Sequence, residues 1–245
     1  MLRQDQNQLQ LLHDNHLSFL SKHRGTLTDR SEFFTLQSEK PEFTFAIVRE
    51  GKLPVAVKEQ YRIIQVLPGA AEYGNELLAQ GLVKVGGLSY MVLKSSLNDW
   101  EMQERLQIKQ AAEEQDIVEF SRVQASAFTS NLAEFDSWYP FLHAANLKNY
   151  KNKDQDFYIA LLDNEPVGVC LVVRTAEVAG LYAVATLEKH RKKGISTTLM
   201  KHAISEAKKL GCQTITLQVS SGSYAEQFYK KLGFQTEFQV DILKS

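Results

Sequence analysis

The sequence has few cysteines, no excess charge of either sign and no long apolar run. Its two cysteines, Cys170 and Cys212, lack CxxC spacing, which argues against a disulfide framework or zinc cluster and favours a reducing, cytoplasmic compartment. Lys and Arg total 28 against 29 Asp and Glu, so we expect no nucleic-acid partner and only a local anion site. No segment approaches membrane-spanning length and no cleavage-site pattern is present, so we expect no membrane partner and no targeting segment.

What is present is an ordinary globular composition of 245 residues, enough for one large or two small domains. Leucines at helical spacing over 9–20, followed by Gly25, predict an amphipathic helix. Its histidines are His13, His16 and His23. No Cys, Asp or Glu completes a metal-ligand set with them, so we place them on a polar helix face and expect no metal.

The first hundred residues mix strand and helix patterns. The patterns predict strands over 43–48, 55–57 and 61–66, a helix over 72–80, and strands within 82–93 joined by a Gly86-Gly87 turn. The chain becomes polar over 98–115, where we place a boundary between an N-terminal α/β domain, residues 1–110, and a second domain, residues 111–245.

The second domain begins with two helix patterns, over 116–128 and 138–147. Three strand patterns joined by short turns follow, over 157–162, 167–174 and 179–186, and they predict an antiparallel meander. A helix to Leu210, a strand over 212–219, a helix over 224–232 and a strand over 234–243 complete the pattern.

A basic, glycine-containing loop joins the third strand to the next helix. Its cationic run from Lys189 to Lys193 precedes Gly194 and the helix start. Free N–H groups and the helix dipole at such a terminus suit a pyrophosphate, and cations that oppose the dipole imply an anionic ligand. A surface charge run or a nucleic-acid or localisation patch would show the same pattern. The loop has neither the Walker pattern nor GxGxxG.

Two segments carry a family resemblance. Arg191-Lys192-Lys193-Gly194-Ile195-Ser196 resembles the acyl-CoA loop of the GNAT superfamily of N-acyltransferases, R/Q-x-x-G-x-G/A. The segment from Ala225 to Phe234 resembles the second signature of that superfamily, a small residue followed by an apolar-Tyr pair and Gly-Phe. The resemblance covers about residues 116–245. It implies an α/β fold with a mixed, largely antiparallel sheet flanked by helices. The order of elements in the first domain is similar to that of a degenerate half-GNAT domain.

The resemblance implies an enzyme that moves an acetyl group from acetyl-CoA to a primary amine by direct attack on the thioester, with a small molecule or a peptide as the amine acceptor. In the family, one strand pairs with the pantetheine arm and supplies the oxyanion N–H, the loop amides hold the pyrophosphate, and a tyrosine matching Tyr229 protonates the thiolate. The residues thus assigned to acyl-CoA binding are Val184, Ala185, Thr186, Arg191, Lys192, Lys193, Gly194, Ile195, Ser196, Thr197, Ala225 and Phe228. Three residues depart from the family pattern. Ser196 replaces the usual Gly or Ala, Glu188 stands where many members have Pro, and Gly222 stands where some members have a CoA-binding Asn.

Other assignments stay open at the level of sequence. Glu177 is a candidate general base or a solvated turn residue, and His202 receives no role. Helix residues Asp136, Trp138, Tyr139 and His143 line an acceptor pocket or form plain helix surface and core. Tyr229 itself is an acid or a core aromatic residue. The alternative function is a non-catalytic regulatory module that binds acyl-CoA. The acceptor, the acyl chain length and the oligomeric state are not predicted.

Overall fold

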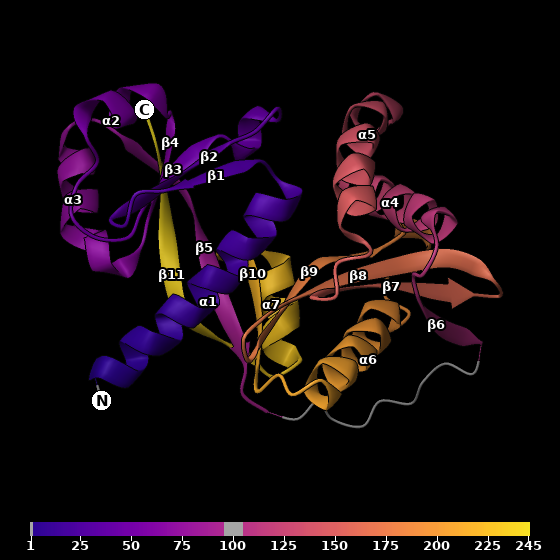
Figure 1. The fold of residues 1–245 in the computed structure, drawn as a ribbon. Helices are drawn as coiled ribbons and strands as arrows, with labels where there is room; N and C mark the ends of the chain where they lie inside the picture. The colour runs from indigo at the N-terminus through magenta and orange to yellow at the C-terminus, as the bar shows by residue number, and fades with distance from the viewer. Residues whose placement is uncertain (1, 96–104) are drawn as a thin grey trace. The chain divides into compact units, whose positions relative to one another are not determined.

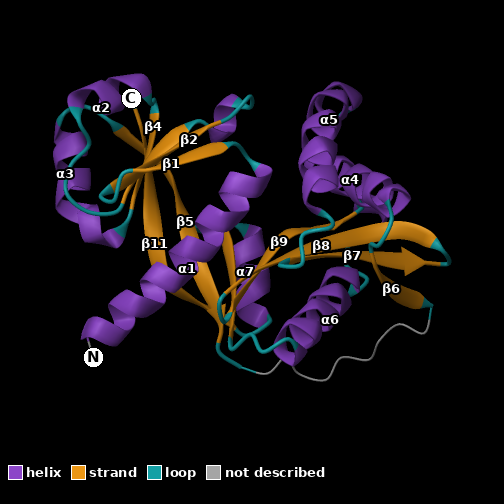
Figure 2. Ribbon diagram, in the orientation of Figure 1, coloured by secondary structure: helices purple, strands orange, loops and turns teal. Residues whose placement is uncertain are grey.

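The computed structural model describes residues 2–95 and 105–245, which form two compact units. The first unit combines the chain up to Ser95 with Leu217–Ser245. The second unit contains the part of the chain that lies between these two segments and ends at Thr216. Each unit mixes helices and strands (Figures 1 and 2). Because the C-terminal segment packs with the first ninety-five residues, the units divide the chain differently from its linear order. The domains 1–110 and 111–245 therefore stay a prediction.

The first unit is built on a mixed sheet with strand order β1-β2-β3-β4-β11-β5, followed by the last part of β10. Its strands are β1 Thr26–Asp29, β2 Phe33–Gln37, β3 Phe45–Val48, β4 Ile63–Val66, β5 Val83–Leu93, β10 Thr214–Ser220 and β11 Phe234–Lys244. Its helices are α1 Leu2–His23, α2 Val55–Gln60, α3 Ala71–Ala79 and α7 Tyr224–Lys231, with 3-10 turns at Pro41–Phe43 and Pro68–Ala70. Strands β3 and β4 run parallel, and β11 pairs antiparallel with β4 and β5.

The N-terminal helix is confirmed, but the prediction that its histidines form a polar face is wrong. His13, His16 and His23 are all buried. The His13 ring lies 5.5 Å from Phe34, and the His16 ring lies 5.5 Å from Tyr90 on β5, centroid to centroid. Burial, with the nearby His16 and Arg49 charges, lowers the pKa of His13 to about 3, so its imidazole is neutral in the folded chain.

Two other local predictions in this unit are wrong. The expected strand at 55–57 is helix α2, because Pro54 precedes it and its carbonyl accepts hydrogen bonds from the N–H groups of Val57 and Lys58. The expected Gly86-Gly87 turn does not form, and β5 continues through it as one strand. The pairing with β11 shifts by one residue here, so the glycines adjoin a β-bulge.

The second unit confirms the antiparallel meander. Its strands are β6 Leu106–Gln110, β7 Gln155–Leu162, β8 Glu165–Thr175 and β9 Val178–Thr186, in the order β9-β8-β7-β6, and β9 also pairs in parallel with the start of β10. Its helices are α4 Glu114–Phe128, α5 Leu132–Asn149 and α6 Ile195–Lys209, with a 3-10 turn at Glu188–His190. Helices α4 and α6 cover opposite faces of the sheet (Figure 1). The predicted fold class, a largely antiparallel mixed sheet flanked by helices, is confirmed.

Candidate active site

Strand β9 bends where the resemblance places the pantetheine-binding strand. Ala183 has a left-handed backbone, φ 50°, and the pairing with β8 shifts between Val169 and Leu171. The pairing of β9 with β10 ends at Gly180. Alternate amides of a strand point to opposite neighbours, so β8 satisfies only half of those in the last part of β9. This edge, which includes Val184–Thr186, can therefore accept an extended ligand.

The loop after β9 ends at the uncapped N-terminus of α6. Lys192 and Gly194 have positive φ values of 62° and 76°, and Gly194 is the N-cap of α6. No side chain caps this terminus and its first turn holds no acidic residue. The first hydrogen bond of the helix runs from the N–H of Thr198 to the carbonyl of Gly194, at 2.9 Å. The first-turn amides of Ile195, Ser196 and Thr197 therefore have no intrahelical acceptor.

Side chains hold this loop in place. The Arg191 guanidinium donates to the carbonyl of Thr186 at 3.3 Å and to that of Ala127, at the end of α4, at 3.1 Å. The hydroxyls of Thr186 and Ser196 are 2.7 Å apart and share a hydrogen bond. The Arg191 side chain thus fixes the loop to its own unit, and its predicted contact with acyl-CoA stays a prediction.

The α6 helix approaches the sheet closely just past the loop. A Cβ added to Gly168 on β8 would lie 3.0 Å from Ile195 Cγ2 and 3.1 Å from the Ala185 carbonyl oxygen. Because only glycine leaves this space, β8 sets the position of the first turn of α6.

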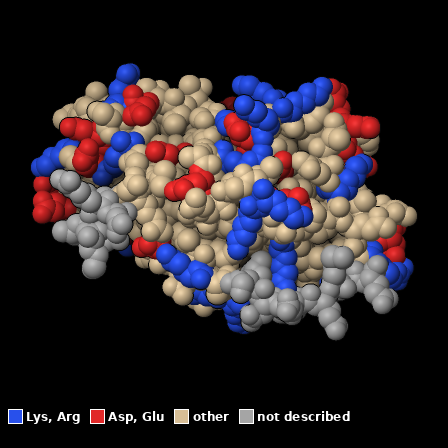
Figure 3. All heavy atoms as spheres, turned by 60° about the horizontal axis from the view of Figure 1, so that its bottom comes forward, with Lys and Arg blue, Asp and Glu red and all other residues tan. Residues whose placement is uncertain are grey.

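The charges at the loop are cationic but local. Lys192 and Lys193 are exposed, and Lys189 lies 3.9 Å from Glu165. Burial of the ring, with the charges of Lys193 and Lys189, lowers the pKa of His190, so this residue adds no charge at neutral pH. On the face drawn in Figure 3, basic and acidic side chains are interspersed. The loop therefore offers phosphate binding through amides and a few lysines rather than through a broad basic surface.

The second signature forms α7 and the start of β11. Ser223 caps α7 by accepting from the N–H of Glu226 at 3.2 Å. The Tyr229 ring is half-buried, with its centroid 5.3 Å from Phe228 and 6.0 Å from Phe234. Ala225 and Phe228 are also half-buried.

Comparison with known proteins identifies this pair of motifs. Residues 117–234 match the model of the Acetyltransferase (GNAT) family. They form a GNAT acetyltransferase domain. The chain thus contains an acyl-CoA N-acyltransferase domain of the GNAT type. The GNAT range crosses the unit boundary: the loop lies in the second unit and Tyr229 lies in the first.

Solved structures, two of them with GNAT names, share this fold. A GCN5-related N-acetyltransferase from Kribbella flavida is 15% identical with a TM-score of 0.67, and the match covers 99% of this chain and 94% of that chain. A functionally unknown conserved protein from Staphylococcus epidermidis is also 15% identical with a TM-score of 0.67, over 89% and 92% of the two chains. A tandem GNAT protein from the clavulanic acid biosynthesis pathway is 12% identical with a TM-score of 0.57, over 87% and 78%. A search of curated proteins finds no match to the sequence.

The other candidate side chains lie within the GNAT domain, and they differ in exposure and contacts. Glu177 is exposed in the β8–β9 turn, and its backbone carbonyl accepts from Gln213 and Thr214. On α5, Asp136 is exposed and Trp138 is half-buried, while Tyr139 stacks on His143 with centroids 5.5 Å apart. These settings do not test the roles that the sequence suggests.

The sequence pattern assigns no role to His202 and does not single out Glu226, two further residues of the GNAT domain. His202 is half-buried, with its ring 5.1 Å from that of Tyr158. Glu226, between Ala225 and Phe228, is buried and accepts three hydrogen bonds. The spacing Ser223-x-x-Glu226 is the signature of a helix capping box and could have drawn attention to it.

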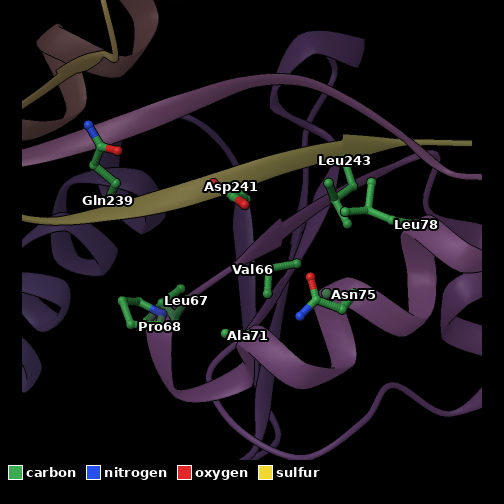
Figure 4. A pocket seen from close by; sticks show the side chains of 10 residues that line it. Val66, Leu67, Pro68, Ala71, Asn75, Leu78, Gln239, Asp241 and Leu243 are labelled. Atoms are coloured by element: carbon green, nitrogen blue, oxygen red, sulfur yellow. The ribbon is translucent and has the colours of Figure 1, made fainter.

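A separate pocket of about 180 Å³ lies in the first unit, between α3, β4 and β11 (Figure 4). Its lining residues are Val66, Leu67, Pro68, Ala71, Gly74, Asn75, Leu78, Gln239, Asp241 and Leu243. The charged residue among them is Asp241, which forms an ion pair with Lys84 at 2.7 Å. Because no cation lines it, this pocket lacks the charge that a pyrophosphate needs.

Proposed function

We propose that this chain transfers an acetyl group from acetyl-CoA to a primary amine. The observation that carries the proposal is the terminus of α6, where Gly194 leaves the first-turn amides open beside Lys192 and Lys193. Helix-terminal amides bind phosphate oxygens well, and two left-handed residues in one loop help to direct N–H groups toward a single anion. In a GNAT domain this is the place for the acyl-CoA pyrophosphate.

The residues of the chain then have distinct tasks. The edge of β9 at Val184–Thr186 pairs with the pantetheine arm, and one of its N–H groups stabilises the oxyanion that forms on the thioester carbonyl. The acetyl thioester supplies the activated acyl group. The amine nitrogen forms a bond to the acyl carbon and loses a proton to solvent, and the C–S bond breaks.

Tyr229 completes the reaction by donating its phenolic proton to the departing thiolate. A phenol has an ordinary pKa near 10, so it remains protonated at neutral pH and is available as an acid. Solvent then returns the proton to the phenolate. On the face in Figure 3, no surface of a single charge sign favours an amine acceptor of one charge class.

We also place the protein in a reducing, cytoplasmic compartment. Both cysteines are buried and unpaired, and burial raises the pKa of the Cys170 thiol to about 12, so it is inert rather than reactive. Among the described residues, no helix is both long enough and apolar enough to cross a bilayer.

The test is release of the CoA thiol from acetyl-CoA in the presence of a panel of primary amines. With the amine that supports turnover, we expect Tyr229→Phe to lower kcat by about a hundredfold or more while acetyl-CoA binding is kept. The matched control is Tyr224→Phe on the same helix, because Tyr224 is 83% exposed. Equal kcat values for the two variants would refute the role of Tyr229. Binding of acetyl-CoA without release of the CoA thiol in the presence of any of the amines would refute the transferase activity.

A further inference from the structure

Glu226 is a buried carboxylate on the short helix that carries Tyr229. Only 2% of the Glu226 surface is exposed, although glutamate rarely occupies a fully buried position. A buried charge is costly unless hydrogen bonds or an ion pair compensate it. The contacts of Glu226 therefore indicate what the residue does.

The carboxylate is fully engaged on both oxygens. Oε1 accepts from the hydroxyls of Ser89 at 2.9 Å and Thr236 at 3.2 Å, and the Lys230 ammonium lies 3.4 Å away. Oε2 accepts from the N–H of Gly222 at 2.9 Å. The Gly222 N–H, ahead of the Ser89 hydroxyl and Lys230, holds the pKa of Glu226 below its ordinary value despite burial, so the group is ionised.

The hydroxyl hydrogen bonds from Ser221 to Ser89 and from Ser89 to Glu226 both donate toward the carboxylate. Ser89 has a single O–H, which it donates to Glu226, so the Ser221 hydroxyl at 2.8 Å must donate to Ser89. The Gln239 amide also donates to Ser89, at 3.2 Å. One buried anion thereby connects β5, β11, the turn after β10 and α7, all within the first unit.

The backbone is adapted to this arrangement. The Ser221 N–H donates to the Gly87 carbonyl at 2.9 Å, and a Cβ on Gly87 would lie 3.0 Å from Ser221 Oγ. Successive residues of a strand face opposite sides of the sheet. On β5, accordingly, Tyr90 packs against His16 of α1 while Ser89 reaches Glu226 of α7.

The position of α7 decides where the Tyr229 phenol lies. A helix of eight residues has little stability of its own, so its orientation depends on tertiary contacts. Glu226 and Tyr229 are three residues apart, hence neighbours on the helix surface, and a rotation of α7 moves both. A displacement of about 1 Å in a reacting group can cost about a hundredfold in rate.

We propose that Glu226 is a positioning residue for Tyr229. Through Ser89, the N-terminal segment contributes to the contacts that hold this helix in place. The inference rests on the proposed function, in which Tyr229 is the acid. It also gives the first ninety-five residues a task in catalysis, because Ser89 lies outside the GNAT range 117–234.

The test compares Glu226→Ala, Glu226→Gln and Ser89→Ala with the control Ser121→Ala. Gln fits the site, because its oxygen can face Gly222 while the hydroxyls turn to accept from its amide. Ser121 is a fully buried serine of α4 whose hydroxyl accepts from Asn146 at 3.0 Å, so the control removes a comparable hydrogen bond elsewhere. Thiol release gives kcat and the KM for acetyl-CoA, well below each melting temperature.

We expect Glu226→Ala to lower kcat by about tenfold or more with a change in KM below about threefold, since the phenol acts in the transition state rather than in binding. Ser89→Ala should lower kcat by about threefold, Glu226→Gln should restore most of the kcat lost in Glu226→Ala, and Ser121→Ala should lower only the melting temperature. If Glu226→Ala does not fold, Ser89→Ala against Ser121→Ala decides the question.

Wild-type kcat in Ser89→Ala and in any folded Glu226→Ala would overturn the proposal, and so would a kcat of Glu226→Gln as low as that of Glu226→Ala. Failure of the proposed function looks different. In that case the wild type binds acetyl-CoA but releases no thiol with any amine, and the role of Glu226 falls with that of Tyr229.

Discussion

Replacing Gly194 by Glu should abolish acyl-CoA binding without removing any contact of the folded chain. Gly194 has φ 76°, and a Cβ there would find nothing within 4 Å. The other end of the same helix offers a matched site, because Gly211 has φ 91° and equally open space. Glu at either position adds the same charge and places a Cβ on a left-handed backbone, so the main difference between the two variants is which end of α6 they change.

Backbone strain and the helix dipole determine how stable the two variants should be relative to each other. A left-handed backbone costs a residue with a Cβ about 1–2 kcal/mol, which lowers the melting temperature of a chain of this size by roughly 2–8 °C. The helix dipole favours an acidic group at the N-terminus and disfavours one at the C-terminus by about 0.3–1 kcal/mol. Without ligand, Gly194→Glu should therefore be at least as stable as Gly211→Glu.

Acetyl-CoA should reverse this order. A ligand at a hundred times its dissociation constant stabilises the folded state by about 2.7 kcal/mol, and a tenfold loss of affinity reduces this to about 1.4 kcal/mol. We expect the full shift in the wild type and in Gly211→Glu, and none in Gly194→Glu, because the new carboxylate occupies the place of the phosphate. The assay is a thermal melt with increasing acetyl-CoA, with ATP as the anion control.

Equal acetyl-CoA shifts in the two variants would refute the assignment of the loop as the phosphate site. An equal shift with ATP in the wild type would instead mean that the loop binds phosphates without selecting CoA.

Two further predictions concern buried charge. Because burial lowers the pKa of His13 to about 3, the unfolded chain binds a proton there between about pH 6.5 and 3 that the folded chain does not. Stability should fall as the pH drops through this window, by about 2 kcal/mol at pH 5, and melts of His13→Phe should depend less on pH than those of the wild type. Asp156 forms an ion pair with Arg174 in which both side chains are mostly buried, so Asp156→Ala should cost about 3–5 kcal/mol in denaturant unfolding. The exposed ion-pair lysine Lys209 is the control, and Lys209→Ala should cost less than about 1 kcal/mol.

Each of these two predictions has an outcome that would contradict it. An unchanged pH dependence in His13→Phe would mean that the His13 ring is protonated or solvated in the folded chain. A loss in Asp156→Ala as small as that in Lys209→Ala would mean that water reaches the Asp156 carboxylate.

The sequence alone determined the elements whose signals are local. Glycine after a basic run marked the start of α6 at Gly194, and alternation with short turns marked the meander of β7, β8 and β9. The motif around Tyr229 pointed to the GNAT family because residue type and spacing along one short segment carry that information. Each of these signals depends on residues within about one helix or hairpin of one another.

The tertiary structure decided what depends on residues far apart in the chain. His13 and His16 looked like a polar face, but the aromatic rings of Phe34 and Tyr90 cover them. Gly86 looked like a turn, but β11, more than a hundred residues later, holds it inside β5. In both cases burial and pairing outweigh local preference, because apolar contact and backbone hydrogen bonds from a distant segment contribute more than intrinsic propensity.

The contacts that hold the helix of Tyr229 show most clearly which features only the tertiary structure decides. The sequence predicts that Tyr229 is the catalytic acid, yet the carboxylate proposed to position its helix, that of Glu226, accepts a hydrogen bond from Ser89, 137 residues away. Glutamate on a helix usually faces water, and no local pattern tells a solvated Glu226 from a buried one. Only the packing of α7 on β5 and β11 makes this charge a buried one, because the hydroxyls and the N–H that compensate it come from three separate segments.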